Sequence, residues 1–338
     1  MNRRVRWVIR IIILLALVAL GLTMVRMPGD REPVRNGPPT PISMGEETMT
    51  VDELARRLEG DVRVLADSIG ERNVYRPEAL EATVTFLEKE LEDAGFRPVR
   101  QSFQVQGVEC HNLEVEIQGT HRPEEIIVIG AHYDSVVGSP GANDNGTGVA
   151  AVLALARIFA DAQPPRTLRF VFFVNEEPPF FTTPEMGSVV YARRSGERGE
   201  DIRGMLSLET IGYYDDTPGS QSYPVGMLGW AYPDRGDFIG FVSNLRSRSL
   251  LRTALGTFRE HAAIPSEGAA LPSFLPGVGW SDHWSFWQEG YPAIMLTDTA
   301  PFRDPGYHTP DDTPDRLDFH RVAQIVNGLV PVVETLTR

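Results

Sequence analysis

The chain has 338 residues, 42% of them hydrophobic, which is enough for a full folded core. Its net charge of −14 argues against a nucleic-acid-binding protein, although acidity alone names no partner. The single cysteine, Cys110, excludes an internal disulfide and a metal site built from several thiolates. Any bound metal must therefore use histidine, aspartate or glutamate side chains.

Residues 1–26 have the pattern of a signal anchor or a signal peptide. Four arginines, the last of them Arg10, precede an uncharged run from Ile11 to Val25. The run is short for a spanning helix, and no Ala-x-Ala cleavage site follows it; we favour an uncleaved anchor in the membrane. Because the arginines lie before the run, the rest of the chain is expected outside the cytoplasm, in the periplasm or extracellular space, and secreted if the segment is cleaved.

A proline-rich stretch separates this segment from the remainder of the chain. Residues 27–47 hold five prolines and few apolar residues, which predicts a semi-extended linker with little fixed structure. Residues 48–338 are then expected to form a single catalytic domain. The domain is predicted to begin with a helix over 51–69 and a second helix from about Pro77 that ends at Gly95.

Strands and helices alternate through the middle of the chain. Strands are predicted at 99–105 and 113–117, and the four β-branched residues Ile126 to Ile129 indicate a buried strand after a turn at 119–123. A helix at 149–159 and a strand at 168–174 follow. This order implies a right-handed crossover, and hence an α/β fold with a mostly parallel central sheet flanked by helices. Further elements are predicted as strands at 205–208 and 293–296, a helical stretch near 238–260 and a C-terminal helix from about Phe319.

Acidic and histidine residues follow four of the predicted strands. In chain order they are His132, Asp134 and Asp144, then Glu176 and Glu177, then Glu209, and finally His308 with Tyr307 before it. A single acid at a strand end is usually a helix cap or a solvated carboxylate. Ligands in open α/β sheets gather at the carboxyl ends of strands, so we expect these groups to meet. Two histidines and three carboxylates suit a pair of divalent ions such as zinc, with one carboxylate bridging them.

Five short motifs carry these residues. They are His132-Tyr-Asp134-Ser, Ala142-Asn-Asp144-Asn-Gly-Thr-Gly148, Glu176-Glu177, Glu209-Thr-Ile-Gly and Tyr307-His308-Thr-Pro. In this order they resemble the metal-binding motifs of the aminopeptidase Y/S-like family of zinc peptidases, over about residue 51 to the C-terminus. The resemblance implies the zinc-aminopeptidase (phosphorylase/hydrolase-like) fold, two Zn²⁺ ions and exopeptidase activity on peptide substrates.

The same resemblance implies a role for each residue. His132 and Glu209 would hold one zinc ion, Glu177 and His308 the other, and Asp144 would bridge both. Asp134 would orient His132, and Glu176 would act as the general base that takes a proton from the attacking water. Tyr307 would stabilise the oxyanion or serve in packing. Relatives commonly have aspartate where Glu209 stands, and they often have a cis peptide after the bridging aspartate, which we predict at Asp144–Asn145.

Other features are given plainer interpretations. Ser281-Asp282-His283 is not a serine hydrolase signature here, because no Gly-x-Ser-x-Gly motif occurs in the chain; His283 is expected to support the site or to pack. The glycosylation sequon at Asn145 lies inside the proposed site and is expected to be unused. An aromatic cluster is expected in the core, formed by Trp280, Trp284, Phe286 and Trp287. Substrate-recognising groups are expected within 212–279.

Two alternatives to the aminopeptidase remain. One is an acyltransferase of the glutaminyl cyclase type, which shares the fold but uses one zinc ion. The other is an ectodomain of the same fold without catalytic activity. The number of bound zinc ions distinguishes the glutaminyl cyclase type from a di-zinc peptidase. Hydrolysis of amino-acyl substrates that a chelator reversibly blocks distinguishes an active peptidase from the inactive ectodomain.

Overall fold

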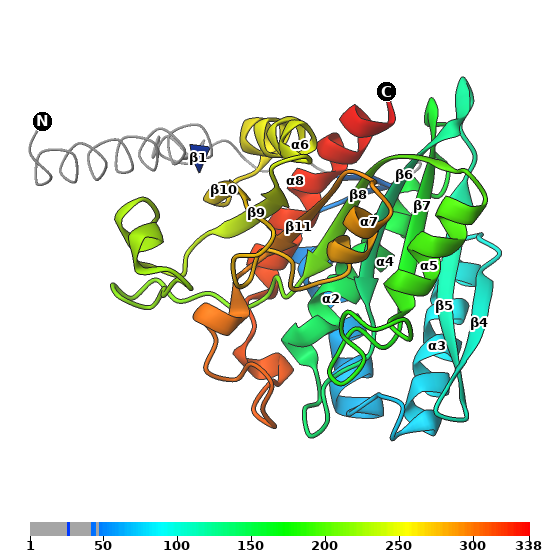
Figure 1. The fold of residues 1–338 in the computed structure, drawn as a ribbon, viewed down its shortest axis with the longest axis horizontal. Helices are drawn as coiled ribbons and strands as arrows, with labels where there is room; N and C mark the ends of the chain where they lie inside the picture. The colour runs from blue at the N-terminus through cyan, green and yellow to red at the C-terminus, as the bar shows by residue number, and fades with distance from the viewer. Residues whose placement is uncertain (1–25, 28–41, 45–46) are drawn as a thin grey trace, which may run out of the picture.

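The computed structural model describes residues 26–27, 42–44 and 47–338. Their dominant feature is a nine-stranded mixed sheet that runs through the middle of the molecule with helices on both faces (Figure 1). Its strands, from one edge to the other, are β1 (Arg26–Met27), β10 (Ser266–Leu271), β9 (Ile239–Asn244), β11 (Ala293–Thr297), β8 (Asp201–Glu209), β6 (Arg122–His132), β7 (Arg166–Phe173), β5 (Val108–Ile117) and β4 (Val99–Val105). The predicted α/β class is confirmed.

The parallel strands lie in the centre of the sheet. Strands β11, β8, β6 and β7 are parallel neighbours, and β10 is parallel to β9. The other pairings in the sheet are antiparallel. The sheet is thus mixed, and the predicted mostly parallel arrangement holds only for its centre. The edge strand pair β4–β5 is a hairpin, which needs no crossover helix and so adds antiparallel strands.

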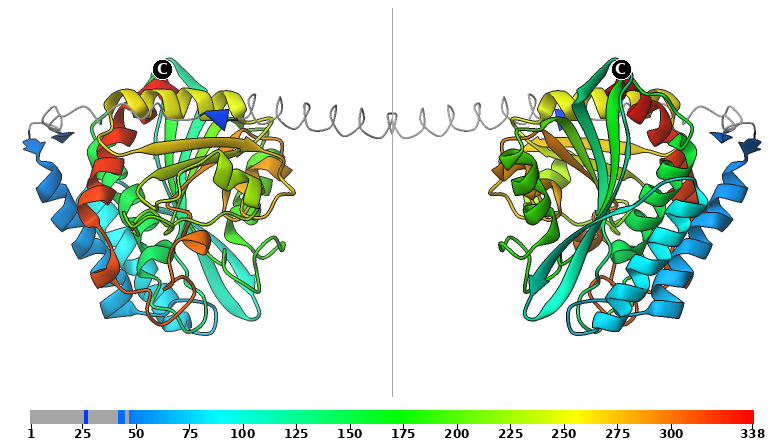
Figure 2. Two further views of the ribbon diagram at one scale, coloured as in Figure 1. Left: turned by 90° about the vertical axis from the view of Figure 1, so that its left-hand side faces the viewer. Right: turned by 90° about the vertical axis from the view of Figure 1, so that its right-hand side faces the viewer.

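Helices cover the two faces unequally (Figure 2). One face packs against α2 (Val51–Arg63), α3 (Pro77–Asp93), α4 (Gly148–Phe159), α6 (Arg248–His261) and α8 (Phe319–Thr337). The other face packs against the shorter α5 (Gly187–Glu197) and α7 (His283–Gln288). Helix α4 is apolar on all sides because it lies between the sheet and helices α2, α3 and α8.

Most elements expected before residue 212 occur close to their predicted bounds. The helix predicted over 51–69 is α2 followed by a π-helical turn, η1 (Val64–Ile69). Helix α3 ends before Gly95, whose φ of +90° suits a glycine at this position. The shorter α5 and α7 were not predicted, because neither shows a long apolar repeat.

The helix predicted near 238–260 is wrong over its first part. Residues 239–244 form strand β9, and the helix α6 begins only at Arg248. Strand β9 lies between β10 and β11 with four of its six residues buried, and its sequence, Ile-Gly-Phe-Val-Ser-Asn, lacks the alternation of apolar and polar residues that marks a half-exposed strand. A short apolar run of this kind cannot be distinguished from a buried helix by its periodicity. Strand β10 was missed for a different reason: Ser-Glu-Gly-Ala-Ala-Leu contains no β-branched or aromatic residue, and those are the residues that favour strands.

The predicted N-terminal anchor lies outside the described residues. Over the part of the chain that the structure describes, no helix is long and apolar enough to cross a membrane. Parts of the predicted linker are paired: β1 extends the main sheet beside β10, and β2 (Ile42–Met44) pairs with β3 (Glu47–Met49). The other residues of the predicted linker, 28–41 and 45–46, lie outside the described part of the chain.

Candidate metal centre

Two clusters of metal-ligating side chains meet at the carboxyl ends of the central strands. The first contains His132, Asp144 and Glu209, and the second contains Asp144, Glu177 and His308. Asp144 belongs to both clusters. The five residues are those that the sequence predicts as ligands, and they come from the ends of β6, β7 and β8, the loop before α4 and the loop after β11.

The spacing between the clustered atoms fits a tetrahedral metal site. Nε2 of His132 lies 3.4 Å from Oδ1 of Asp144 and 3.3 Å from Oε2 of Glu209. Nε2 of His308 lies 3.1 Å from Oδ2 of Asp144 and 3.3 Å from Oε2 of Glu177. Ligand atoms about 2.0 to 2.1 Å from a tetrahedral zinc ion are about 3.3 Å apart. Within the described residues, His132 Nε2 and Asp144 Oδ2 are buried without a hydrogen-bond partner, as atoms that face a cation would be.

His132 is oriented from its other ring nitrogen. Its Nδ1 lies 3.2 Å from the backbone oxygen of Asp134 and 3.5 Å from that residue's carboxylate. A proton on Nδ1 that is donated to these oxygens leaves the Nε2 lone pair directed at the ligand cluster. The shorter contact is to the backbone, so the Asp134 carboxylate acts on His132 less directly than the resemblance implies.

The Asp134 carboxylate has a second set of contacts. Its two oxygens accept hydrogen bonds from the backbone N–H groups of Glu176, at 3.1 Å, and Glu177, at 3.2 Å. Asp134 therefore ties the end of β6 to the turn after β7. That turn aims the two neighbouring glutamates differently: Glu177 joins the His308 cluster, while Oε2 of Glu176 lies 3.9 Å from His132 Nε2 and belongs to neither cluster. Glu176 thus faces the site without being counted among the ligands.

The loop that carries Asp144 is fully buried and is held by a residue that sequence reasoning missed. The peptide Asp144–Asn145 is cis, as predicted. The carboxylate of Asp312 accepts hydrogen bonds from the backbone N–H groups of Asn143, at 2.7 Å, and Asp144, at 3.1 Å. Asp312 lies four residues after His308, but nothing in the local pattern distinguishes it from a solvated acid. Asn145 is 0% exposed, which excludes its glycosylation in the folded protein.

Two residues of the Ser281-Asp282-His283 segment have different roles. The Ser281 hydroxyl donates a 2.7 Å hydrogen bond to Oε2 of Glu209. His283 is buried, with Nε2 2.8 Å from the backbone oxygen of Val278, and it packs edge-on against Trp287. His283 is thus a packing residue, while Ser281 supports a predicted ligand and was not identified from the sequence.

Burial and mutual repulsion raise the pKa values of the three glutamates at the site. Burial would also raise the pKa of Asp144, but its contacts with His132 and His308 lower it. Burial, reinforced by the charge of Asp144, raises the pKa of Glu177 to about 8. Burial is also the main cause of the raised pKa of Glu176. Burial alone would lower the pKa of His308, but its contacts with Asp144 and Glu177 raise it to about 10. These shifts show a site that holds excess negative charge, and bound cations would favour the ionised carboxylates.

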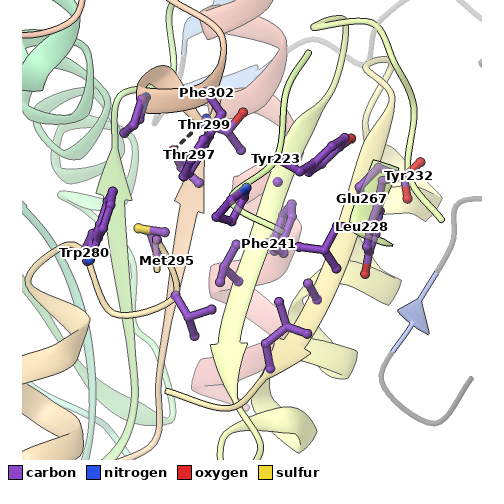
Figure 3. Close-up of a pocket in the computed structure, with 18 of the residues that line it drawn as sticks. Tyr223, Leu228, Tyr232, Phe241, Glu267, Trp280, Met295, Thr297, Thr299 and Phe302 are labelled. Carbon is purple, nitrogen blue, oxygen red and sulfur yellow. Dashed lines mark hydrogen bonds between the residues drawn. The ribbon is translucent and has the colours of Figure 1, made fainter. Parts of the chain in front are cut away.

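An apolar cavity adjoins the first ligand cluster (Figure 3). It encloses about 840 Å³ including its open mouth, and both Glu209 and Tyr307 line it. The Tyr307 ring stacks on that of His308, with ring centroids 3.8 Å apart, and burial raises the pKa of its hydroxyl. Phe286 and Trp287 are buried as predicted, whereas Trp280 is 45% exposed and lines the cavity, so its assignment to the core is wrong. The loop before α7 directs Trp280 away from the aromatic core.

Comparisons with known proteins agree with this geometry. The chain is 37% identical over 285 residues to the uncharacterized protein YfbL of Escherichia coli, covering 82% of this chain and 87% of that protein. It is 28% identical over 244 residues to leucine aminopeptidase 1 of Arthroderma otae, covering 68% of this chain and 58% of that protein.

Solved structures show the same fold at lower identity. A zinc aminopeptidase from Bacillus subtilis superposes with a TM-score of 0.65 at 14% identity, covering 82% of this chain and 94% of that chain. A glutaminyl cyclase from Fimbriiglobus ruber superposes with a TM-score of 0.61 at 18% identity, covering 91% and 99%. Since both enzymes share the fold, the fold alone does not separate the two activities.

A match to a family model assigns the chain to a family. Residues 112–333 match the model of Peptidase family M28, and that range includes every residue of both ligand clusters. This chain therefore belongs to peptidase family M28.

Proposed function

We propose that the chain is a di-zinc aminopeptidase that removes N-terminal residues from peptides outside the cytoplasm. The observation that supports this most strongly is the pair of ligand clusters that share Asp144, next to a cavity that Glu209 and Tyr307 also line. One shared carboxylate with two further ligands on each side is an arrangement for two neighbouring ions. The leucine aminopeptidase relative and the zinc aminopeptidase fold support the choice of reaction and metal.

The residues around the clusters have separate tasks in this reaction. Bound zinc would supply Lewis acidity toward the scissile carbonyl and the attacking water. Glu176 would accept the proton of that water and pass it to the leaving amine, since its carboxylate faces His132 from outside both clusters. Asp134 would keep Glu176 in place through the backbone N–H group that it binds. The protonated hydroxyl of Tyr307 would donate a hydrogen bond to the developing oxyanion.

The extracytoplasmic location rests on the N-terminal sequence alone. The arginine-rich segment followed by the apolar run at 11–25 would export or anchor the catalytic domain. Extraction of membranes with alkaline carbonate tests the anchor: retention of the full-length protein in the membrane fraction is expected, and its release would contradict the proposal.

Metal content and activity test the proposed reaction together. We expect two zinc ions per chain by elemental analysis, and hydrolysis of leucine p-nitroanilide that a chelator abolishes and added zinc restores. Glu176→Gln should keep both ions and lose at least about 100-fold in kcat, because it removes only the proton acceptor. Glu185→Gln, at an exposed position, is the matched control and should behave like the wild type. Near-wild-type turnover of Glu176→Gln would refute the assigned role.

The shared ligand gives a second, activity-free test. Asp144→Ala should weaken both ions, whereas Glu209→Ala and His308→Ala should each weaken mainly one, because only Asp144 belongs to both clusters. Loss of a single ion in Asp144→Ala would contradict the shared site. One tightly bound zinc ion in the wild type, with formation of pyroglutamate from N-terminal glutamine, would favour the glutaminyl cyclase alternative. Two ions without hydrolysis of any of a varied set of amino-acyl substrates would favour the inactive ectodomain.

A further inference from the structure

Two neighbouring strands of the sheet lead into exposed apolar side chains at the end away from the metal centre. Strands β9 and β10 are parallel, and their last residues, Asn244 and Leu271, are paired with each other. Leu245 follows β9 directly and is 45% exposed, and Phe274, in the turn after β10, is 83% exposed. Both residues therefore leave the sheet at the same place. Exposed apolar side chains that gather in this way mark a contact surface.

The surroundings of these two residues are cationic, although the chain as a whole is acidic. Residues 238–252 hold three arginines and no acidic residue, and residues 268–281 hold no charged residue, in a chain of net charge −14. The three arginines are exposed, and no ion pair with a described residue neutralises them. Arginines beside apolar side chains are the composition that binds the surface of a membrane with anionic lipids. We call this group the basic end of the sheet: Leu245, Arg246, Arg248, Arg252 and Phe274.

The predicted membrane segment meets the described structure beside the basic end. Its apolar run stops at Val25, and the next residue, Arg26, begins β1. Strand β1 is antiparallel to β10, and Arg26 is paired with Ala269 (Figure 1). Met27 is paired with Gly268, which is one residue farther from the carboxyl end of β10. The sequence thus leaves no spacer between the run and the sheet, so an anchored chain would hold this end of the sheet at the membrane.

The basic end is within electrostatic range of a membrane at this position. The Debye length is about 8 Å at physiological ionic strength, close to two strand spacings of about 4.8 Å. Strands β10 and β9, which lead into the exposed residues, are the first and second strands inward from β1. Anionic headgroups beside β1 would therefore attract the arginines, and the two apolar side chains would enter the lipid interface.

We propose that the basic end lies on the surface of the membrane that holds the N-terminal anchor. Phe274 and Leu245 enter the boundary between headgroups and acyl chains, and the arginines contact anionic headgroups. This inference rests on the uncleaved anchor of the proposed function and adds a second contact with the same membrane. None of the residues of the basic end belongs to the ligand clusters.

This contact would turn the metal centre away from the membrane. Thr297, which is paired with the ligand Glu209, is also paired with Gly240 near the start of β9. Leu245 follows the other end of that strand. Extended backbone rises about 3.3 Å per residue, so Gly240 and Leu245 are about 17 Å apart along β9. The ligand clusters therefore face the aqueous side, where soluble peptides reach them.

Fluorescent labels on the full-length protein in vesicles test the contact. Phe274→Cys and, separately, Val137→Cys are labelled with the dye NBD in vesicles of phosphatidylcholine and phosphatidylglycerol that carry a nitroxide on the upper acyl chain. The nitroxide should quench the label at position 274 about twofold or more and leave the label at position 137 nearly unchanged. Val137 is the matched control, because it is 56% exposed and follows β6 at the metal-centre end. The wild type, whose Cys110 is buried, corrects for unspecific labelling.

Two results of this experiment would overturn the proposal. One is equal quenching at positions 274 and 137, and the other is the absence of quenching at position 274. The second result is also expected if the basic end binds an acidic protein instead of lipid, because the vesicles contain no such partner. Hydrolysis of leucine p-nitroanilide by Phe274→Cys should match that of the wild type, which shows that the fold is intact.

Reversal of charge tests the arginines. Arg246→Glu combined with Arg248→Glu should remove about half or more of the quenching at position 274, because carboxylates repel anionic headgroups. Arg97→Glu combined with Arg193→Glu makes the same change of charge at two other exposed positions and should leave the quenching unchanged. Salt at about 1 M, where the Debye length falls to about 3 Å, should weaken the quenching of the label in the parent protein. Equal quenching in the two double variants would refute binding by the arginines.

Flotation of the vesicles separates failure of the anchor from failure of the second contact. Full-length protein that does not float with the vesicles would refute the anchor and the proposed contact with it. Protein that floats but whose label at position 274 is not quenched would refute the contact alone. Neither measurement depends on peptidase activity, so an inactive wild type would refute the aminopeptidase function without changing either result.

Discussion

The hydroxyl of Ser281 donates its hydrogen bond to the same oxygen of Glu209 that approaches His132. That oxygen, Oε2, is 2.7 Å from the serine hydroxyl and 3.3 Å from His132 Nε2. Ser281 in turn contacts the hydroxyl of Ser207 at 2.8 Å. Glu209 is one methylene longer than the aspartate that the resemblance predicts at this position. The buried pair Ser281 and Ser207 holds the carboxylate of this longer side chain in place.

Removal of this support should weaken one metal ion. Ser281→Ala is expected to lower the zinc affinity of the His132 cluster by about 10- to 100-fold, the usual effect of losing a hydrogen-bond partner of a ligand. The affinity of the His308 cluster should change little, since Ser281 does not contact it. Competition with a chromogenic chelator measures both affinities. Ser285→Ala, which breaks a comparable buried serine pair with Ser188, is the control; an equal loss of affinity in both variants would contradict this role.

Arg72 should be among the side chains on which stability depends most. It is 0% exposed, and its guanidinium donates to the backbone oxygens of Tyr133 at 2.5 Å, Pro140 at 2.6 Å and Gly141 at 2.7 Å. Arg72→Met would leave buried carbonyl groups without donors, and we expect a loss of about 3 to 5 kcal/mol in the free energy of unfolding, measured by urea denaturation. Arg76→Met, whose side chain is 63% exposed, should cost less than about 1 kcal/mol. A similar small change in both variants would show that Arg72 is dispensable.

Substitution of Gly148 by alanine sets two effects on stability against each other, a gain in helix propensity and a steric clash. Alanine at the start of α4 would favour the helix by about 1 kcal/mol, yet its Cβ would lie 2.3 Å from Oδ1 of Asn145 and 2.3 Å from the backbone oxygen of Leu208. The clash should prevail, and Gly148→Ala is expected to destabilise the fold by about 1 to 3 kcal/mol in thermal unfolding. Gly256→Ala in α6, where a Cβ would meet nothing within 4 Å, should instead stabilise it by about 0.5 to 1 kcal/mol. If both Gly148→Ala and Gly256→Ala stabilised the fold, the predicted clash at Gly148 would be contradicted.

His283 should make the fold less stable in mild acid. Burial lowers its pKa from 6.5 to about 4, so between these values the unfolded chain binds a proton that the folded protein does not. Stability then rises with pH through this window, and its contribution falls by up to about 3 kcal/mol as pH drops from 6.5 to 4. Relative to the wild type, His283→Gln should lose this part of the pH dependence, measured by urea unfolding at several pH values. His121→Gln, at an exposed position, should keep it.

The ligand set could be predicted because each ligand follows a strand that the local sequence identifies. The β-branched run before His132 and the apolar run before Glu176 mark their strands without any tertiary information, and parallel strands bring their carboxyl ends to one edge. The structure brings all five predicted ligands into two clusters. The missed supports, Ser281 and Asp312, are separated from their partners by 72 and 168 or more residues, and neither has a local signature.

The sequence by itself determined the chemical groups and the strand ends that carry them, since both are encoded within a few neighbouring residues. Only the tertiary structure decided which partners these groups meet. Strand β9 has the sequence Ile-Gly-Phe-Val-Ser-Asn, which lacks the alternation of apolar and polar residues that would place it in the sheet. The registers between β10, β9, β11 and β8 are long-range properties, and together they place Glu267 in one cross-strand row with Glu209. The metal ligands could thus be predicted from the local sequence, whereas the residues that line the cavity could be identified only from the tertiary structure.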